Sequence, residues 1–154
     1  MAGEIEARLA QLGITLPQAA APAANYVPTV IAGGMLYISG QLPMQDGKVA
    51  QTGHLGGGVS IEQGQAAARL CAINILAQAK AALGDLDRIE RCVRLGAFVS
   101  STPDFTDHPK VANGASDLMV EVLGDKGRHA RAAVGAPSLP LGVSVEVDAV
   151  FAIR

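Results

Sequence analysis

Hydrophobic residues recur along the chain with two spacings, and the longer spacing marks three helices. Apolar positions three or four residues apart predict a short amphipathic helix at the N-terminus, a long one over residues 61–83 and another from about residue 109. Their apolar faces are, in chain order, Ile5, Leu9 and Leu12; Ile61, Ala68, Cys71, Ile75, Ala79 and Leu83; and Val111, Ala115, Leu118 and Val122. The helices should end at Gly13, Gly84 and Gly124, and Ser60 with Gln63 forms a capping-box pattern before the longest one.

Alternation of apolar and polar residues marks the strands. The segment VPTVIAGGMLYISGQLP predicts two strands that meet at Gly33-Gly34, and MQDGKV predicts a tight hairpin around Asp46-Gly47. Further strands are expected in RCVRLGAFVS, RAAVG and VSVEVDAVFAI, whereas LPQAAAPAANYVP, TGHLGGGVS, DKGRH and APSLPLG should be irregular connections. The order strands, helix, strand, helix, strands favours an α+β fold in which two long helices cover one face of a single sheet.

The last strand indicates what the other face of that sheet is like. Side chains alternate along a strand, so one face should carry Val143, Val145, Val147, Ala149 and Phe151, and the other Ser144, Glu146, Asp148 and Val150. The first face meets the helices. The second is mixed in polarity, and the chain has no third layer to cover it. We therefore expect the protein to oligomerise through this face of the sheet.

Composition and charge narrow the classes of protein that fit. A chain of 154 residues suits one domain. A net charge of −2, only 3% aromatic residues and no lysine or arginine run disfavour a nucleic-acid partner. The apolar segments are too interrupted to span a bilayer, and the N-terminus lacks a signal-peptide pattern, so no membrane association is expected. Cys71 and Cys92 should be reduced thiols in a cytoplasmic protein.

Several common kinds of active site find no support in the sequence. His54, His108 and His129 lack metal-ligand spacing, so no metal site is expected. The three glycines at 56–58 fit neither a phosphate-binding loop nor a dinucleotide fingerprint, and no serine lies in a nucleophile elbow. The charged residues left to consider are Arg131, at the start of a strand, and Glu146, inside the valine-rich last strand.

Arg131 and Glu146 have two interpretations. The plain one is a surface or interface salt bridge. In the other, Arg131 presents its planar fork to a substrate carboxylate. Glu146, with its pKa raised by partial burial between valines, would then handle the proton of a water molecule. The residues alone leave both interpretations open.

Three stretches of the chain resemble the RidA/YjgF family of imine/enamine deaminases, also known as endoribonuclease L-PSP. They are YVPTVIAGGMLYISGQLP, PDF followed by VANGASDL, and RAAVGAPSLPLGVSVEVDAV. The resemblance runs from about Tyr26 to the C-terminus. Residues 1–25, a helix and its connection, look like the extension of a longer subgroup, ahead of a single domain over 26–154. The resemblance implies a chorismate-mutase-like fold that assembles as a homotrimer through the open face of the sheet.

The resemblance also implies roles for individual residues. Arg131 matches the arginine that binds the substrate carboxylate, and Glu146 matches the glutamate that polarises the attacking water. The other matching positions are Tyr26, which would close the pocket from the neighbouring subunit, Gly40, whose backbone would lie beside the substrate, and Asn113, near the pocket. Ala133 stands where many members have a cysteine, whose backbone is expected to touch the catalytic water. Strand-end packing, a turn and a helix surface remain open interpretations for Tyr26, Gly40 and Asn113.

The implied reaction is hydrolysis of reactive enamines and imines of the 2-aminoacrylate type to 2-oxo acids and ammonia, without metal or organic cofactor. A trimer that binds small carboxylates without efficient catalysis is the alternative. A ribonuclease is disfavoured by the acidic charge, the absence of a basic groove and the scarcity of stacking aromatics. A structural or chaperone role also stays open.

Overall fold

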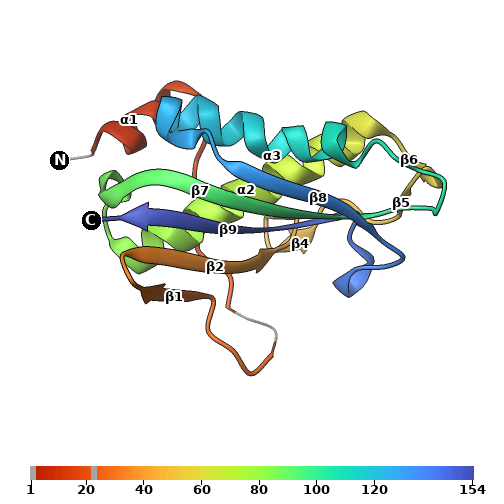
Figure 1. Cartoon of the computed structure of the whole chain (residues 1–154), viewed down its shortest axis with the longest axis horizontal. Helices are drawn as coiled ribbons and strands as arrows, with labels where there is room; N and C mark the ends of the chain where they lie inside the picture. The colour runs from red at the N-terminus through yellow and green to blue at the C-terminus, as the bar shows by residue number, and fades with distance from the viewer. Residues whose placement is uncertain (1–2, 22–23) are drawn as a thin grey trace.

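The structure is a computed structural model that describes residues 3–21 and 24–154, so residues 1, 2, 22 and 23 of the predicted N-terminal region lie outside it. A five-stranded sheet forms one layer, and helices α2 (Ile61–Leu83) and α3 (His108–Leu123) form the other (Figure 1). The sheet has the order β1-β2-β9-β7-β8, with β8 parallel to β7 and the other neighbours antiparallel. Its strands are β1 (Thr29–Ala32), β2 (Met35–Gln41), β7 (Ile89–Ser100), β8 (Ala130–Ala136) and β9 (Val145–Ile153). The predicted α+β fold, with two long helices on one face, is confirmed.

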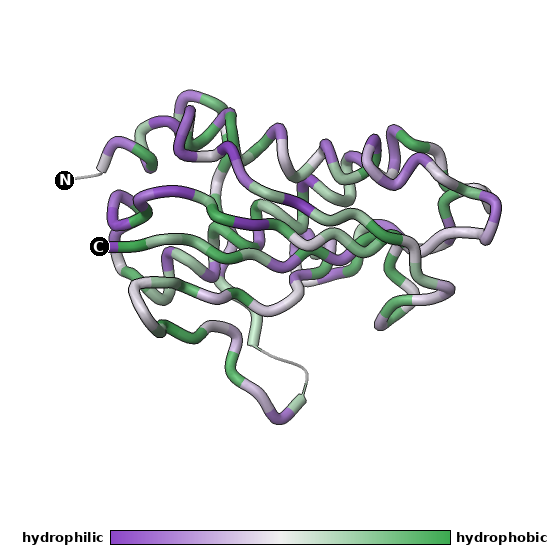
Figure 2. The backbone as a smooth tube through the Cα atoms, in the orientation of Figure 1, coloured by the Kyte–Doolittle hydropathy of each residue, from purple (hydrophilic) through white to green (hydrophobic). Residues whose placement is uncertain are grey.

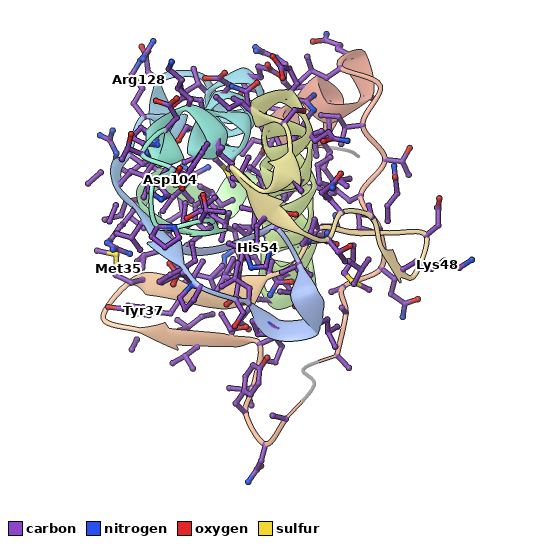
Figure 3. The ribbon with its side chains drawn as sticks, turned by 90° about the vertical axis from the view of Figure 1, so that its right-hand side faces the viewer. Met35, Tyr37, Lys48, His54, Asp104 and Arg128 are labelled. Carbon is purple, nitrogen blue, oxygen red and sulfur yellow. The ribbon has the colours of Figure 1, made fainter. Side chains whose placement is uncertain are left out.

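Smaller elements connect these layers. They are helix α1 (Glu4–Gln11), the hairpin β3 (Met44–Gln45) with β4 (Lys48–Val49), strands β5 (His54–Leu55) and β6 (Gly58–Val59), and the 3₁₀ turns η1 (Leu86–Arg88), η2 (Gly124–Gly127) and η3 (Pro140–Gly142). Lys48 projects from the β3–β4 hairpin away from the sheet (Figure 3). The prediction of wholly irregular structure between Thr52 and Ser60 is wrong, because β5 pairs with β6 there in parallel orientation.

Local sequence signals produce the turns and caps that they predict. Gly33 and Gly34 have φ angles of 59° and 76°. Positive φ at both central residues fits a tight hairpin turn between strands, which glycine adopts without strain. Before α2, the Ser60 hydroxyl accepts a hydrogen bond from the Gln63 N–H at 3.1 Å, and the Gln63 side chain accepts one from the Ser60 N–H at 2.9 Å. The capping box is therefore present.

The hydrophobic core lies between the helices and the sheet. The predicted apolar face of α2 is buried except for Ile61, which is half-buried. The inward residues of β9 are buried and the alternate ones half-buried, as the period of two predicts. By length and composition alone α2 could cross a membrane, but 61% of its most apolar stretch is buried within the chain. Burial of this kind is typical of the core helix of a globular domain.

The face of the sheet turned away from the helices is uncovered and carries large apolar side chains. Val30, Tyr37, Phe98 and Val134 lie on it, with exposed fractions from 36% to 50%. Edge strand β1 is strongly hydrophobic although it is exposed (Figure 2). The same face carries Asp148, which forms an ion pair with Arg94 at 3.6 Å. This mixed, open face matches the prediction, and association through it stays a prediction.

Helix α1 departs in part from its prediction. Ile5 and Leu9 are buried in the core, but Leu12 is 39% exposed because it lies at the C-cap, past the end of the helix. The first turn is capped from a distant part of the chain, since the Asp87 carboxylate accepts hydrogen bonds from the N–H groups of Glu4 at 2.8 Å and of Ile5 at 3.0 Å. These bonds hold the pKa of Asp87 below its usual range. The division of the chain at residue 25 stays a prediction, although α1 packs on the same core.

Candidate active site

Arg131 lies on β8, the strand at one edge of the sheet. Its register partner on β7 is the buried residue Leu95, so the Arg131 side chain emerges on the face covered by the helices. There its guanidinium reaches α3. Nη1 donates hydrogen bonds to the side-chain oxygen Oδ1 of Asn113 at 2.9 Å and to the Ser116 hydroxyl at 3.0 Å, and Nη2 donates one to the Pro109 backbone carbonyl at 3.4 Å. The predicted neighbours Arg131 and Asn113 are therefore in direct contact.

These contacts leave one edge of the Arg131 guanidinium free. A guanidinium carries five N–H donors, one on Nε and two on each Nη. Within residues 3–21 and 24–154, both Nη1 donors and one Nη2 donor are used. The Nε donor and the second Nη2 donor remain, and together they match the two oxygens of a carboxylate. Arg131 is thus oriented by its own chain and still able to bind an anion.

Glu146 lies on β9 in the middle of the sheet and emerges on the open face. Its register partner on β7 is Phe98, one of the exposed apolar residues of that face. Partial burial, followed by the negative charge of Asp148, raises the pKa of Glu146 above its usual range. A carboxylate of this kind holds a proton more readily than an exposed glutamate does.

Gly40 makes room for the Glu146 carboxylate. Gly40 lies on β2 beside β9, at a point where the register between the two strands shifts. A Cβ atom at this position would overlap the carboxylate group of Glu146. The φ angle of Gly40 is not positive, so a turn does not require glycine here. Glycine is required because the Glu146 carboxylate occupies the space that a Cβ atom would need.

Arg131 and Glu146 lie on opposite faces of the same sheet. Arg131 shares its face with Leu95 and with α3, whereas Glu146 shares the other face with Phe98 and Asp148. No ion pair joins them within the described residues. One copy of the chain therefore does not bring the two predicted reactive groups to one substrate, and the salt bridge between them within one chain is absent.

Tyr26 and Gly40 line one pocket, beside the tip of turn η3. Tyr26 is 49% exposed, so it does not pack in the core. The far wall of the pocket is a cluster of buried amide side chains, Gln41, Asn74 and Gln78. The Asn74 amide donates to the carbonyls of Leu42 at 3.3 Å and Met44 at 3.1 Å, and the Gln78 amide donates to the carbonyl of Ala20 at 2.8 Å. These bonds fix the chain on both sides of the pocket.

Comparison with known proteins identifies the family. The profile of the family described as "YjgF/chorismate_mutase-like, putative endoribonuclease" matches residues 6–152. This chain belongs to that family. It is 54% identical over 153 residues to Protein TCP17 of Trypanosoma cruzi, across 99% of this chain and 96% of that protein.

Solved structures of similar proteins have the same fold. The protein Atu1372 from Agrobacterium tumefaciens, described as of unknown function, has a TM-score of 0.91 and 56% identity, over 97% of this chain and 92% of its own. A protein from Shewanella oneidensis described as a "putative endoribonuclease" has a TM-score of 0.95 and 38% identity, over 98% of this chain and all of its own. The resemblance to the RidA/YjgF family and its chorismate-mutase-like fold is confirmed.

Ala133 stands at the position where the resemblance implies a cysteine in many members of the family. Ala133 lies two residues after Arg131 on β8, so both side chains emerge on the same face. It is half-buried and packs against the core. Its methyl group leaves the backbone of β8 as the polar surface beside Arg131. The two cysteines of the chain lie elsewhere: Cys71 and Cys92 are free and buried, and burial raises the pKa of Cys92 to about 12.

Sequence reasoning did not single out two residues that contact the Arg131 cluster. Ser116 accepts a hydrogen bond from Arg131, and His129 contacts the same hydroxyl at 2.8 Å. The spacing of Asn113 and Ser116 was a usable signal, because residues three apart lie on one face of a helix. His129 could not be assigned to the site, because it lies in the charged DKGRH segment, whose path the sequence pattern leaves open.

The other histidines do not form a metal site. His54 contacts the Pro137 carbonyl at 2.8 Å, and His108 contacts the Ser101 hydroxyl at 3.2 Å. Across residues 3–21 and 24–154, no group of three or more histidine, cysteine, aspartate or glutamate side chains is placed to hold a metal ion.

Proposed function

We propose that this YjgF-family protein hydrolyses small anionic imines and enamines of the 2-aminoacrylate type. The products are a 2-oxo acid and ammonia. Overall, one water molecule adds across the C=N bond, its oxygen becomes the ketone oxygen, and the nitrogen leaves as ammonia. The proposal requires a group that holds the carboxylate of the substrate and a base that activates the water.

The observation that carries the proposal is that the chain holds both a preoriented arginine and a half-buried glutamate of raised pKa. The free Nε–Nη2 edge of Arg131 can bind a carboxylate through two parallel hydrogen bonds. The carboxylate of Glu146, which lies close against Gly40 and has a raised pKa, can act as the base. An imine is already electrophilic, so these two groups suffice for hydrolysis without a covalent intermediate.

The placement of the two groups supports a site shared between copies of the chain. Because Arg131 and Glu146 lie on opposite faces of the sheet, one copy would supply the arginine and its neighbour the glutamate. A contact between two different surfaces generates a ring when its rotation closes. The family resemblance implies three copies, and the open apolar face with Tyr37 and Phe98 is the surface that such a ring would bury.

In this mechanism Arg131 fixes the substrate carboxylate and thereby orients the carbon of the C=N bond. Glu146 accepts a proton from the water as its oxygen attacks that carbon. The same carboxyl group returns the proton to the nitrogen, which gives a carbinolamine. The carboxylate then accepts the proton of the new hydroxyl group and passes it to the nitrogen, so that the C=O bond forms as the C–N bond breaks and ammonia leaves. The raised pKa of Glu146 suits these transfers, because the group must gain and lose a proton near neutral pH.

Ammonia release tests the reaction directly. Enamines are generated in situ from several amino acids, and ammonia and 2-oxo acid are measured with the wild-type protein and with Glu146→Gln. The variant keeps the shape of the side chain but loses the base, so hydrolysis should fall by about a hundredfold or more while binding of a 2-oxo acid persists. Hydrolysis at the wild-type rate by Glu146→Gln would favour the alternative, a carboxylate-binding protein without this chemistry.

Light scattering tests the assembly. A closed trimer should have three times the chain mass of 15.7 kDa at micromolar concentration. A monomer mass would contradict the shared site. Because related proteins are described as putative endoribonucleases, ribonuclease activity is a second activity to measure. The net charge of −2 does not favour binding of RNA.

A further inference from the structure

Ser116 on α3 lies at the centre of a chain of hydrogen bonds that ends at Arg131. Its hydroxyl is 3.0 Å from Nη1 of Arg131 and 2.8 Å from Nε2 of His129. On the far side of the ring, Nδ1 of His129 is 2.5 Å from the Gly127 carbonyl. The chain of contacts therefore runs from the backbone of η2, through an imidazole and a hydroxyl, to the arginine that would bind the substrate.

The chemistry of these groups allows one direction of donation in the neutral state. A carbonyl only accepts, so Nδ1 of His129 carries the proton and donates to Gly127. The neutral ring then has an unprotonated Nε2, which accepts from the Ser116 hydroxyl. The oxygen of Ser116 is left to accept from Nη1 of Arg131, which can only donate.

The surroundings keep His129 in this neutral form. Burial, together with the positive charge of Arg131, holds the pKa of His129 below its usual range, although the bond to Gly127 acts in the opposite direction. Ser116, His129 and Arg131 line one surface pocket. The other charged groups that line it are Asp117 on α3 and Arg128, which precedes His129. Arg91 on β7 donates to the Arg128 carbonyl at 2.7 Å and so anchors this segment to the sheet.

We propose that Ser116 and His129 are positioning residues that hold the Arg131 guanidinium so that its Nε–Nη2 edge faces a substrate carboxylate. The inference rests on the proposed function, in which Arg131 binds that carboxylate. Ser116 accepts a hydrogen bond from one Nη1 N–H and Asn113 accepts one from the other, which fixes the orientation of the planar guanidinium relative to α3. His129 acts through Ser116, because its fixed tautomer leaves the hydroxyl oxygen free to accept from Arg131.

The experiment uses calorimetric titration of the full chain with 2-oxobutanoate at pH 8, where His129 is neutral. Ser116→Ala and His129→Phe should each weaken binding about fivefold, the effect of one lost hydrogen bond. Ser116→Thr keeps the hydroxyl and His129→Gln keeps an acceptor near the Nε2 position, so both should bind nearly as well as wild type. Ser101→Ala is the matched control, because Ser101 and His108 form a second serine–histidine contact, at 3.2 Å, that does not involve Arg131.

Nitrogen NMR of the histidine rings provides a reading that does not depend on ligand. Wild type should show His129 protonated on Nδ1 and unprotonated on Nε2, and Ser116→Ala should move the Nε2 signal of His129 and leave that of His108 in place. Equal affinities for wild type, Ser116→Ala and His129→Phe would overturn the positioning role. If wild type and Arg131→Lys both fail to bind 2-oxobutanoate, the proposed function is wrong. If the His129 Nε2 signal does not move in Ser116→Ala, the hydrogen bond between Ser116 and His129 is absent, whatever the outcome of the binding experiment.

Discussion

The surroundings of Arg131 and of Glu146 differ in how each charged group is held. Arg131 makes three hydrogen bonds to α3, two of them to side chains. Glu146 has no hydrogen-bond or ion-pair partner for its carboxylate within residues 3–21 and 24–154, and its neighbour on β2 is a glycine. The Arg131 guanidinium is therefore held in place by its own chain, whereas the Glu146 carboxylate keeps its lone pairs available.

This difference suits Arg131 to substrate binding and Glu146 to proton transfer. A guanidinium that is already oriented loses little conformational entropy when it binds a carboxylate. A half-buried carboxylate without partners has a raised pKa and can exchange protons with water. Substitutions near Arg131 should therefore change affinity, and substitutions near Glu146 should change the rate of hydrolysis.

Arg131→Lys tests the binding side most strongly. Lysine keeps the positive charge but loses the planar fork and the ability to contact Asn113, Ser116 and a carboxylate together. We expect kcat/KM for enamine hydrolysis to fall about a hundredfold, because a carboxylate held at one point is free to rotate. Steady-state ammonia release measures the effect. A loss below about threefold would show that charge alone suffices.

Gly40→Ala tests the role of the Glu146 carboxylate without changing a charge. The new methyl group would overlap the Glu146 carboxylate and displace it. We expect kcat to fall about tenfold or more while affinity for 2-oxobutanoate stays near that of wild type. Gly96→Ala is the matched control, since its methyl group would meet the Asp148 carboxylate on the same face. Equal losses in both variants would contradict a specific role for the space beside Glu146.

Asn113→Ala should have a moderate effect on binding. It removes one of the two acceptors of Nη1 and leaves the exposed surface of α3 otherwise unchanged. Calorimetry with 2-oxobutanoate should show affinity reduced about fivefold, the value of one hydrogen bond. Gln65→Ala serves as the control. The amide of Gln65, on α2, donates to the Lys110 carbonyl on α3 at 2.9 Å but does not contact Arg131. A larger loss in the control than in Asn113→Ala would argue against the contact.

Asp148→Asn should have the smallest effect, a shift of the pH profile. Burial and the charge of Asp148 raise the pKa of Glu146, so the base becomes protonated, and hydrolysis declines, at a higher pH than for an exposed glutamate. Removal of the Asp148 charge lowers this pKa, and the acidic limb of kcat/KM should move to lower pH. Asp125→Asn, at a fully exposed and distant side chain, should leave the limb in place. A move to higher pH would contradict the assignment of the limb to Glu146.

Much of the fold follows from signals that are local in the sequence. The capping box at Ser60, the glycine pair at 33–34 and the alternation along β9 involve residues a few positions apart, and each is present as predicted. The short strands β5 and β6 were not predicted, because a two-residue pairing has no periodicity to detect. The buried amides Asn74 and Gln78 were not predicted either, because their bonds to the carbonyls of Leu42, Met44 and Ala20 join residues 30 or more positions apart.

The sequence by itself determined the helices, the main strands, the face of β9 that carries Glu146 and, through resemblance, the residues of the candidate site. Tertiary structure decided three further points: that Asp87 caps α1, that Ser116 and His129 contact the Arg131 cluster, and that Arg131 and Glu146 lie on opposite faces. Periodicity reports which side of its own element a residue occupies. It carries no information about which distant backbone N–H or side chain that residue meets, because strand order and register set those distances.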